Sequence, residues 1–153
     1  MAINLKIIFL DVDGVLNNDA TTTRTKSGAE FVDDYLIERL KRLINETDAT
    51  VVLSSSWRYG RNCNSHGDDF VELIEKLESY GIYVEDYTPE LHTDDKALEI
   101  NEYLGEHPDV EKFVILDDDP MSMYVDHHVR TLNRYGLTEE NVDEAIEILN
   151  KNN

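Results

Sequence analysis

The fold is decided by the stretch Ile7-Ile8-Phe9-Leu10-Asp11-Val12-Asp13-Gly14-Val15-Leu16. In this stretch, four apolar residues lead directly into two carboxylates, and a glycine follows. The apolar run is too short for a helix and is typical of a strand that is buried on both faces. In an open parallel sheet, functional groups collect at the carboxyl ends of such strands. The stretch therefore predicts a buried strand with Asp11 and Asp13 at its functional end.

Asp11 and Asp13 need a reason to share one strand end, because two close carboxylates repel each other. A pleated strand would point their side chains to opposite faces, so the backbone must turn there. Gly14 allows such a turn without steric cost. A cation relieves the repulsion. We expect Mg²⁺, which takes oxygen ligands and usually keeps waters and a substrate phosphate.

Length and composition predict a single domain over residues 1–153, with an ordinary 41% of hydrophobic residues. No apolar run approaches the length of a membrane span, and the N-terminus lacks a signal-peptide pattern, so we expect no membrane partner. The single cysteine, Cys63, cannot form an internal disulfide. This composition favours a reducing, cytoplasmic location.

The charge balance is strongly acidic: 33 acidic and 14 basic residues give a formal net charge of -19. A nucleic-acid binder is expected to carry a basic face. This chain could provide one only locally, through Arg58, Arg61, Arg130 and Arg134. The composition therefore disfavours extended nucleic-acid contact and favours affinity for cations.

Strand and helix patterns alternate along the rest of the chain. Further strands are expected over residues 49–53, 82–84, 112–116 and 127–132. Between them, helices are expected to begin at Asp33 or Asp34, at Asp68, at Thr93 or Asp94, and at Thr138. Residues 17–30 are polar and are expected to form a loop or small hairpin flap. The alternation predicts an α/β fold: a three-layer, Rossmann-like domain with a mostly parallel five-stranded sheet and helices on both faces.

Three of the expected strands end in functional groups, and one expected helix begins with a cation. The groups are Asp11 and Asp13, Ser54 and Ser55, Asp117, Asp118 and Asp119, and Lys96. Carboxylates can hold a metal ion and attack phosphorus, a hydroxyl can donate to a phosphoryl oxygen, and an ammonium can balance the developing charge. The set is typical of phosphoryl transfer.

In their order, these groups resemble the haloacid dehalogenase-like (HAD) phosphatase superfamily. Residues 9–16 match its first motif closely, and residues 51–54 look like the second, an apolar strand that ends in a hydroxyl. Lys96 before an apolar helix resembles the third motif, and residues 114–118 resemble the acidic fourth. The resemblance covers nearly the whole chain.

The resemblance implies a role for each matching residue. Asp11 would be the nucleophile that forms an aspartyl-phosphate, and Asp13 would be the general acid and then the general base. Ser54 would hydrogen-bond the phosphoryl group, with Ser55 as the alternative in the triple serine. Lys96 would stabilise both Asp11 and the phosphate.

The resemblance also implies a Mg²⁺ site. Asp118, together with Asp117, would hold the ion beside Asp11 and the backbone carbonyl of Asp13. Three consecutive aspartates leave open which of Asp117, Asp118 and Asp119 contacts the metal directly.

The chain has little room for the cap insertions that select small substrates in this superfamily. Only residues 17–30 are free after the first motif, so no large cap is expected and the site should be open. Residues 53–58 and 136–138 are similar to those of small HAD domains associated with RNA repair. The implied substrate is a phosphorylated small molecule or a phosphorylated nucleic-acid end, and Arg58 could grip a terminal phosphate.

The expected function is Mg²⁺-dependent hydrolysis of a phosphomonoester. One alternative is a receiver-like domain that accepts phosphate from a partner and holds it. Asp13 argues against this alternative, because an acid or base two residues after the nucleophile promotes turnover. The other alternative is a non-catalytic, metal-binding interaction module that retains the fold.

Overall fold

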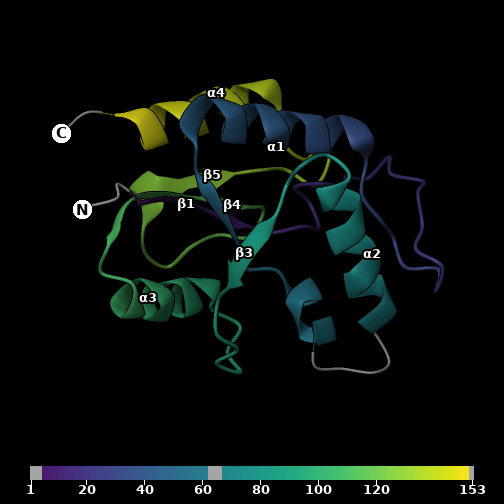
Figure 1. Ribbon diagram of the computed structural model, residues 1–153, viewed down its shortest axis with the longest axis horizontal. Helices are drawn as coiled ribbons and strands as arrows, with labels where there is room; N and C mark the ends of the chain where they lie inside the picture. Colours follow the sequence, from purple (N-terminus) through teal and green to yellow (C-terminus); the bar gives the residue numbers. More distant parts are fainter. Residues whose placement is uncertain (1–4, 62–66, 152–153) are drawn as a thin grey trace.

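A five-stranded sheet forms the centre of the computed structural model, which describes residues 5–61 and 67–151 (Figure 1). All neighbouring strands run parallel, in the order β3-β2-β1-β4-β5. Their bounds are β1 (Leu5–Leu10), β2 (Thr50–Leu53), β3 (Val84–Tyr87), β4 (Val110–Asp117) and β5 (His128–Arg130). The predicted α/β fold is confirmed, and its sheet is entirely parallel.

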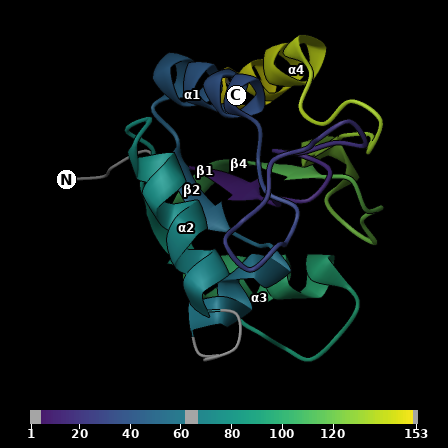
Figure 2. The same cartoon turned by 90° about the vertical axis from the view of Figure 1, so that its right-hand side faces the viewer.

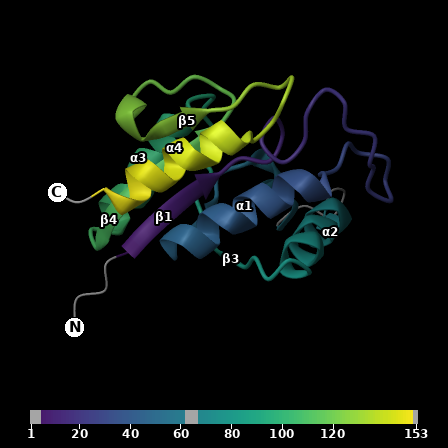
Figure 3. The same ribbon diagram turned by 90° about the horizontal axis from the view of Figure 1, so that it is seen from above.

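Four α-helices and two short 3₁₀ helices connect the strands. Their bounds are α1 (Asp34–Thr47), η1 (Ser56–Arg61), α2 (Gly67–Glu78), α3 (Lys96–Glu106), η2 (Val125–His127) and α4 (Glu139–Asn150). Helices α1 and α4 lie side by side on one face of the sheet (Figures 1 and 3), and α3 covers the opposite face (Figure 2). The sheet is therefore covered on both faces, as predicted.

The pleat of β1 divides its apolar side chains between the two cores. Ile8 and Leu10 pack into the cluster that contains the buried residues of α1, α2 and α4. Ile7 and Phe9 pack into the cluster that contains Ile100 of α3. These four side chains are buried, so each contributes about 1.5–3 kcal/mol of transfer free energy. This burial on both faces explains why the sequence of the strand contains a continuous apolar run.

The strand order and register place the ends of three strands together. The chain adds β2 and β3 on one side of β1, and β4 and β5 on the other. The order therefore reverses between β1 and β4, which is where open α/β sheets bind ligands. Leu10 pairs with Leu53 of β2 and with Leu116 of β4, so the next residue of each strand lies in one row.

β3 begins later than the sequence predicted, at Val84 rather than at residue 82. The cause is the end of α2, where Gly81 has a left-handed φ of 75°. The Ile82 N–H donates to the Leu77 carbonyl, and the Gly81 N–H donates to the Glu78 carbonyl. This is a Schellman motif, in which the apolar residue after the glycine packs back on the helix. Ile82 is therefore buried as part of a helix cap and not as part of a strand.

Other element boundaries agree with the sequence to within a few residues. α3 begins at Lys96, and its N-cap is Asp95, whose side chain accepts a hydrogen bond from the Ala97 N–H, in place of the expected Thr93 or Asp94. α2 begins at Gly67, one residue before the expected start. Cys63 lies outside the described residues.

Residues 17–30 form the flap that the sequence predicted. Arg24 and Glu30 make an antiparallel bridge, and the Ser27 hydroxyl donates to Asp69 of α2 at 2.7 Å. Within residues 5–61 and 67–151, the strands form one five-stranded sheet, and the flap adds only an isolated bridge. These residues therefore contain no second sheet that could serve as a cap. Among the same residues, every helix is too short or too polar to span a bilayer.

The predicted cap of α4 gives a test of the fold. The Thr138 hydroxyl accepts from the Asn141 N–H at 3.1 Å, and the Asn141 side chain accepts from the Thr138 N–H at 2.9 Å. Thr138→Ala should lower the free energy of unfolding by about 1 kcal/mol in urea titrations, because it removes the hydroxyl that accepts the Asn141 N–H. Thr22→Ala, at an exposed position of the flap, is the matched control. Equal losses in the two variants would contradict the assignment.

Candidate active site

Three candidate side chains lie next to one another at the carboxyl end of the sheet, because the strand register aligns the residues that precede them. Asp11, Ser54 and Asp117 come directly after the aligned residues of β1, β2 and β4. The Asp11 N–H donates to the Leu116 carbonyl at 3.0 Å, and the Ser54 N–H donates to the Leu10 carbonyl at 2.9 Å. The sheet ladder thus continues by one residue and holds the backbone of Asp11 and Ser54 in place.

A group of carboxylates forms the most acidic part of this site. Oxygen atoms of Asp11, Asp117 and Asp118 lie within 4.8 Å of one another. Asp11 and Asp117 are buried and Asp118 is partly buried. Asp119 lies outside this group, and its amide donates to Asp117 Oδ1 at 2.9 Å. Of the three consecutive aspartates, the first two therefore face Asp11.

The electrostatics of this group fit a bound divalent cation. Burial raises the pKa of Asp11 well above its ordinary value, and the Asp117 carboxylate raises it further. Burial, followed by repulsion from Asp117 and Asp119, raises the pKa of Asp118. Such pKa shifts mean that the ionised carboxylates have too little positive charge near them to be fully stabilised. Carboxylate oxygens are the ligands that Mg²⁺ prefers, so these residues fit the expected ion.

Lys96 is the cation that the structure itself supplies to the group. Its Nζ lies 3.1 Å from Asp117 Oδ2 and 3.3 Å from Asp11 Oδ1. Burial lowers the pKa of Lys96, but attraction to Asp11 and Asp117 outweighs burial, so the pKa lies well above its ordinary value. A cation in the first turn of α3 opposes the helix dipole. The two carboxylates explain why it is nevertheless stable there.

The turn after β1 requires glycine at position 14 for two reasons. Gly14 has a φ of 82°, which L side chains rarely adopt. A Cβ at this position would meet Asp118 Oδ2 and would lie 2.6 Å from Asn133 Oδ1. The Asn17 side chain accepts from the Gly14 N–H at 2.8 Å and closes the turn. Gly14 therefore allows the turn and Asp118 to approach each other closely.

Asp13 lies beside the carboxylate group, with its side chain directed elsewhere. Asn17 Nδ2 donates to Asp13 Oδ1 at 2.9 Å, and Trp57 Nε1 donates to Asp13 Oδ2 at 3.2 Å. These two donors fix the orientation of an exposed carboxylate. The sequence did not reveal the Trp57 contact, because only folding brings η1 next to the turn. That the Asp13 carbonyl contacts the metal remains a prediction.

The two candidate serines have different surroundings. The Ser54 hydroxyl is buried and has no hydrogen-bond partner among the described residues. The Ser55 hydroxyl accepts from the Trp57 N–H at 3.1 Å at the start of η1. An unpaired buried hydroxyl is costly and calls for a partner such as a ligand. Ser54 therefore has the hydroxyl without a partner, whereas Ser55 has a structural contact, and contact of either hydroxyl with a substrate stays a prediction.

Thr88 is a further residue of the row that the sequence did not identify. It follows Tyr87, which pairs with Leu53, and its N–H donates to the Leu53 carbonyl at 3.1 Å. Its hydroxyl, like that of Ser54, is buried without a hydrogen-bond partner in the described part of the chain. The sequence gives little signal for it, because β3 contains Glu85 and Asp86 and the expected strand ended at residue 84.

Arg58 does not occupy the position that was expected for a phosphate-gripping residue. Only 1% of the residue is exposed. Its five N–H donors, each of which could otherwise bind a phosphate, are all used within the protein. They bond the carbonyls of Thr88, Ser54, Ser55 and Pro89 and the Glu99 carboxylate. The expectation for Arg58 is therefore wrong, because a guanidinium with no free donor cannot bind a substrate phosphate.

The buried pair of Arg58 and Glu99 instead joins three parts of the site. Arg58 holds the Ser54 carbonyl at 2.9 Å and contacts Glu99 at 2.9 Å. Glu99 lies on α3, three residues after Lys96, and its second oxygen accepts from the Leu91 N–H at 3.0 Å. The pair thus fixes the position of Ser54 relative to the helix that carries Lys96.

Loss of this pair should cost far more stability than loss of a surface pair. Glu99→Ala leaves the Arg58 charge buried without its partner, so the free energy of unfolding should fall by about 3–5 kcal/mol. Glu46→Ala removes an exposed carboxylate that contacts Arg42 at 2.8 Å, and should cost at most about 1 kcal/mol. Urea unfolding of both variants provides the measurement. Losses of similar size would show that Arg58 does not depend on Glu99.

The model of the family described as "HAD domain in Swiss Army Knife RNA repair proteins" matches residues 7–142. No curated protein matches the chain. A crystal structure of hypothetical protein XCC2798 from Xanthomonas campestris shares 16% identity with a TM-score of 0.48, and the match covers 97% of this chain and 83% of that one. Because the family match spans both the strand-end acids and Lys96, the chain belongs to the HAD domains of Swiss Army Knife RNA repair proteins.

Proposed function

We propose that this HAD-type hydrolase is a phosphatase that cleaves phosphomonoesters through a covalent intermediate on Asp11. The observation that carries the proposal is the contact of Lys96 with Asp11 and Asp117, within a group that also includes Asp118. A nucleophilic carboxylate, an ammonium and a set of oxygen ligands are the parts that phosphoryl transfer requires.

Asp11, Asp117 and Asp118 would hold Mg²⁺, together with the backbone carbonyl of Asp13. Bound there, the ion supplies positive charge against the phosphoryl oxygens. Lys96 supplies a second positive charge from the protein, so a phosphate dianion can approach the acidic site.

Asp11 and Asp13 would perform the two chemical steps, each of which combines a transfer of the phosphoryl group with a transfer of one proton. An oxygen of Asp11 attacks phosphorus and breaks the bond to the leaving oxygen, which takes a proton from Asp13. Water then attacks phosphorus and gives a proton to Asp13, and the bond between phosphorus and Asp11 breaks. Phosphate leaves, and Asp11 is again a free carboxylate. The hydrogen bonds from Asn17 and Trp57 hold Asp13 ready for both transfers.

Ser54 would bind the transferred phosphoryl group. Its buried, unpaired hydroxyl lies one strand away from Asp11 in the same row. A donor that is fixed before the reaction stabilises charge on the transition state without reorganisation.

The substrate class that fits best is a nucleotide or the phosphorylated end of a nucleic acid. The family's description connects these domains with RNA repair. Over the described residues, no second sheet covers the site, which leaves access for a large substrate. The net charge of -19 restricts contact to the terminal nucleotide, because a longer phosphate backbone would be repelled.

Substitution of either aspartate of the first motif should remove activity. Hydrolysis of para-nitrophenyl phosphate should require Mg²⁺ and stop in EDTA. Asp11→Asn removes the nucleophile and should leave only background turnover. Asp13→Asn should reduce kcat by about 10²–10⁴-fold, because acid–base catalysis is worth that much. Asp109→Asn, at an exposed position, is the control and should retain full activity.

Two other results would favour the two alternative functions. Stoichiometric labelling of the protein without turnover would support a phospho-acceptor domain. No reaction with this substrate, nucleotides or phosphorylated oligonucleotides would support a non-catalytic binding module. The hydrogen bonds that orient Asp13 favour turnover over both alternatives.

The raised pKa values of Asp11 and Asp118 predict how pH affects the Mg²⁺ site. In the metal-free protein, the folded state binds protons at these two carboxyls more tightly than the unfolded state does. The resulting stabilisation of the fold is present below the ordinary carboxyl pKa of 3.8 and is lost as pH rises through the raised pKa values. Protons therefore compete with the ion. Mg²⁺ should raise Tm more at about pH 7.5 than at about pH 5. Asp118→Asn should reduce this rise and Asp126→Asn should not; an equal rise at both pH values would contradict the assignment.

A further inference from the structure

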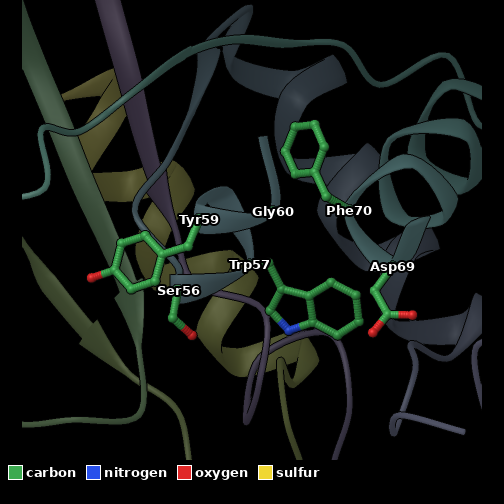
Figure 4. Close-up of a pocket in the computed structure, with 6 residues that line it drawn as sticks. All are labelled: Ser56, Trp57, Tyr59, Gly60, Asp69 and Phe70. Carbon is green, nitrogen blue, oxygen red and sulfur yellow. The ribbon is translucent and has the colours of Figure 1, made fainter. Parts of the chain in front are cut away.

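A pocket of about 290 Å³ lies beside the proposed catalytic residues and has no role in the chemistry described above. It is lined by Ser56, Trp57, Tyr59, Gly60, Asp69 and Phe70, which come from η1 and from the start of α2 (Figure 4). Three of the six residues carry aromatic rings. In Figure 4, the Trp57 indole lies between Tyr59 and Asp69, and the Phe70 ring lies above it.

The pocket is directly connected to the site through Trp57. One edge of the indole lines the pocket, and Nε1 donates to Asp13 Oδ2 at 3.2 Å. η1 also begins immediately after Ser54 and Ser55, so the pocket wall continues the segment that would bind the phosphoryl group. A substrate whose leaving group accepts a proton from Asp13 therefore has the pocket next to that leaving group.

Neighbouring rings hold the aromatic walls in place. Trp57 packs against Phe31, the residue directly after the flap, with ring centroids 6.2 Å apart. Phe70 packs against Tyr87 with ring centroids 6.0 Å apart. Tyr59 is 42% exposed, and the Arg58 guanidinium lies over its ring, 4.9 Å from the centroid. Flat, fixed aromatic faces are suited to stacking with a flat ligand.

Among the described residues that line the pocket, Asp69 is the only one with a charged side chain. The Ser27 hydroxyl donates to Asp69 Oδ1 at 2.7 Å and orients it. A carboxylate accepts hydrogen bonds and repels phosphate. The pocket therefore suits a neutral, flat group with N–H donors, while the phosphate would lie with Lys96 and the proposed cation.

We propose that this pocket binds the nucleobase of the nucleotide whose phosphate the enzyme removes. The base would stack on Trp57, Tyr59 and Phe70, and its amino or imino groups would donate to Asp69. This inference rests on the proposed phosphatase function and adds to it the part of the substrate that is recognised.

Direct binding can be measured without catalysis, because Trp57 is the only tryptophan of the chain. The probes are adenosine and cytidine monophosphates with the phosphate at the 3′ or 5′ position, and ribose 5-phosphate as a probe without a base. Turnover is prevented by using Asp11→Asn with Mg²⁺ and the wild type with EDTA. Nucleotides should quench the fluorescence of Trp57 in a saturable manner, and ribose 5-phosphate should not.

Variants of the pocket separate stacking from other effects. Tyr59→Ala should weaken nucleotide binding about tenfold, the effect of losing one stacking contact. Phe70→Leu keeps an apolar side chain without the ring and should weaken binding to a similar extent. Tyr83→Ala removes a tyrosine that is 59% exposed and does not line the pocket, and should leave binding unchanged. In kinetics, the ratio of kcat/KM for nucleotide to kcat/KM for ribose 5-phosphate should exceed about ten and fall in the pocket variants.

The outcomes distinguish failure of the pocket from failure of the enzyme. Hydrolysis of both substrates with equal kcat/KM, and no quenching, would overturn the nucleobase site and leave the phosphatase proposal intact. Saturable quenching by nucleotides without any hydrolysis would support the base site and contradict the phosphatase. Phosphotyrosine that quenches as strongly as the nucleotides would also overturn the proposal, because it would show a pocket for any aromatic ring.

Discussion

Three carboxylates within 4.8 Å of one another repel, and burial strengthens the repulsion because the protein interior screens charge poorly. The fold can hold Asp11, Asp117 and Asp118 together only if the backbone is fixed and positive charge is close. The parallel ladder of β1 and β4 provides the fixed backbone, and Lys96 provides part of the charge. Because Lys96 does not balance all of the negative charge, the pKa values of Asp11 and Asp118 remain raised.

The second cation near the site, Arg58, has a different physical role. Its donors are used by four backbone carbonyls and by Glu99, so it organises loops instead of meeting a ligand. Arginine suits this position because its planar guanidinium presents five donors in fixed directions. Of these two cations, Lys96 contacts the carboxylates and Arg58 fixes the position of Ser54.

The sequence predicted the parts of the site that depend on local pattern. An apolar run that ends in a polar residue marks both a buried strand and a functional strand end, so Asp11, Ser54 and Asp117 were found together. Arg58 was misinterpreted because a basic residue after the serines has the same local pattern whether it faces solvent or the core. The deciding partner, Glu99, lies 41 residues away. Thr88 was missed because Ile82, an apolar residue of a helix cap, resembles the start of a strand.

The two outer strands of the sheet, β3 and β5, have only four and three residues. An open strand edge offers unpaired backbone groups on which another chain can add a strand, and short edges limit this hazard. The net charge of -19 adds repulsion between copies of the chain. Together, these features should protect a sheet with a strongly apolar centre against ordered aggregation.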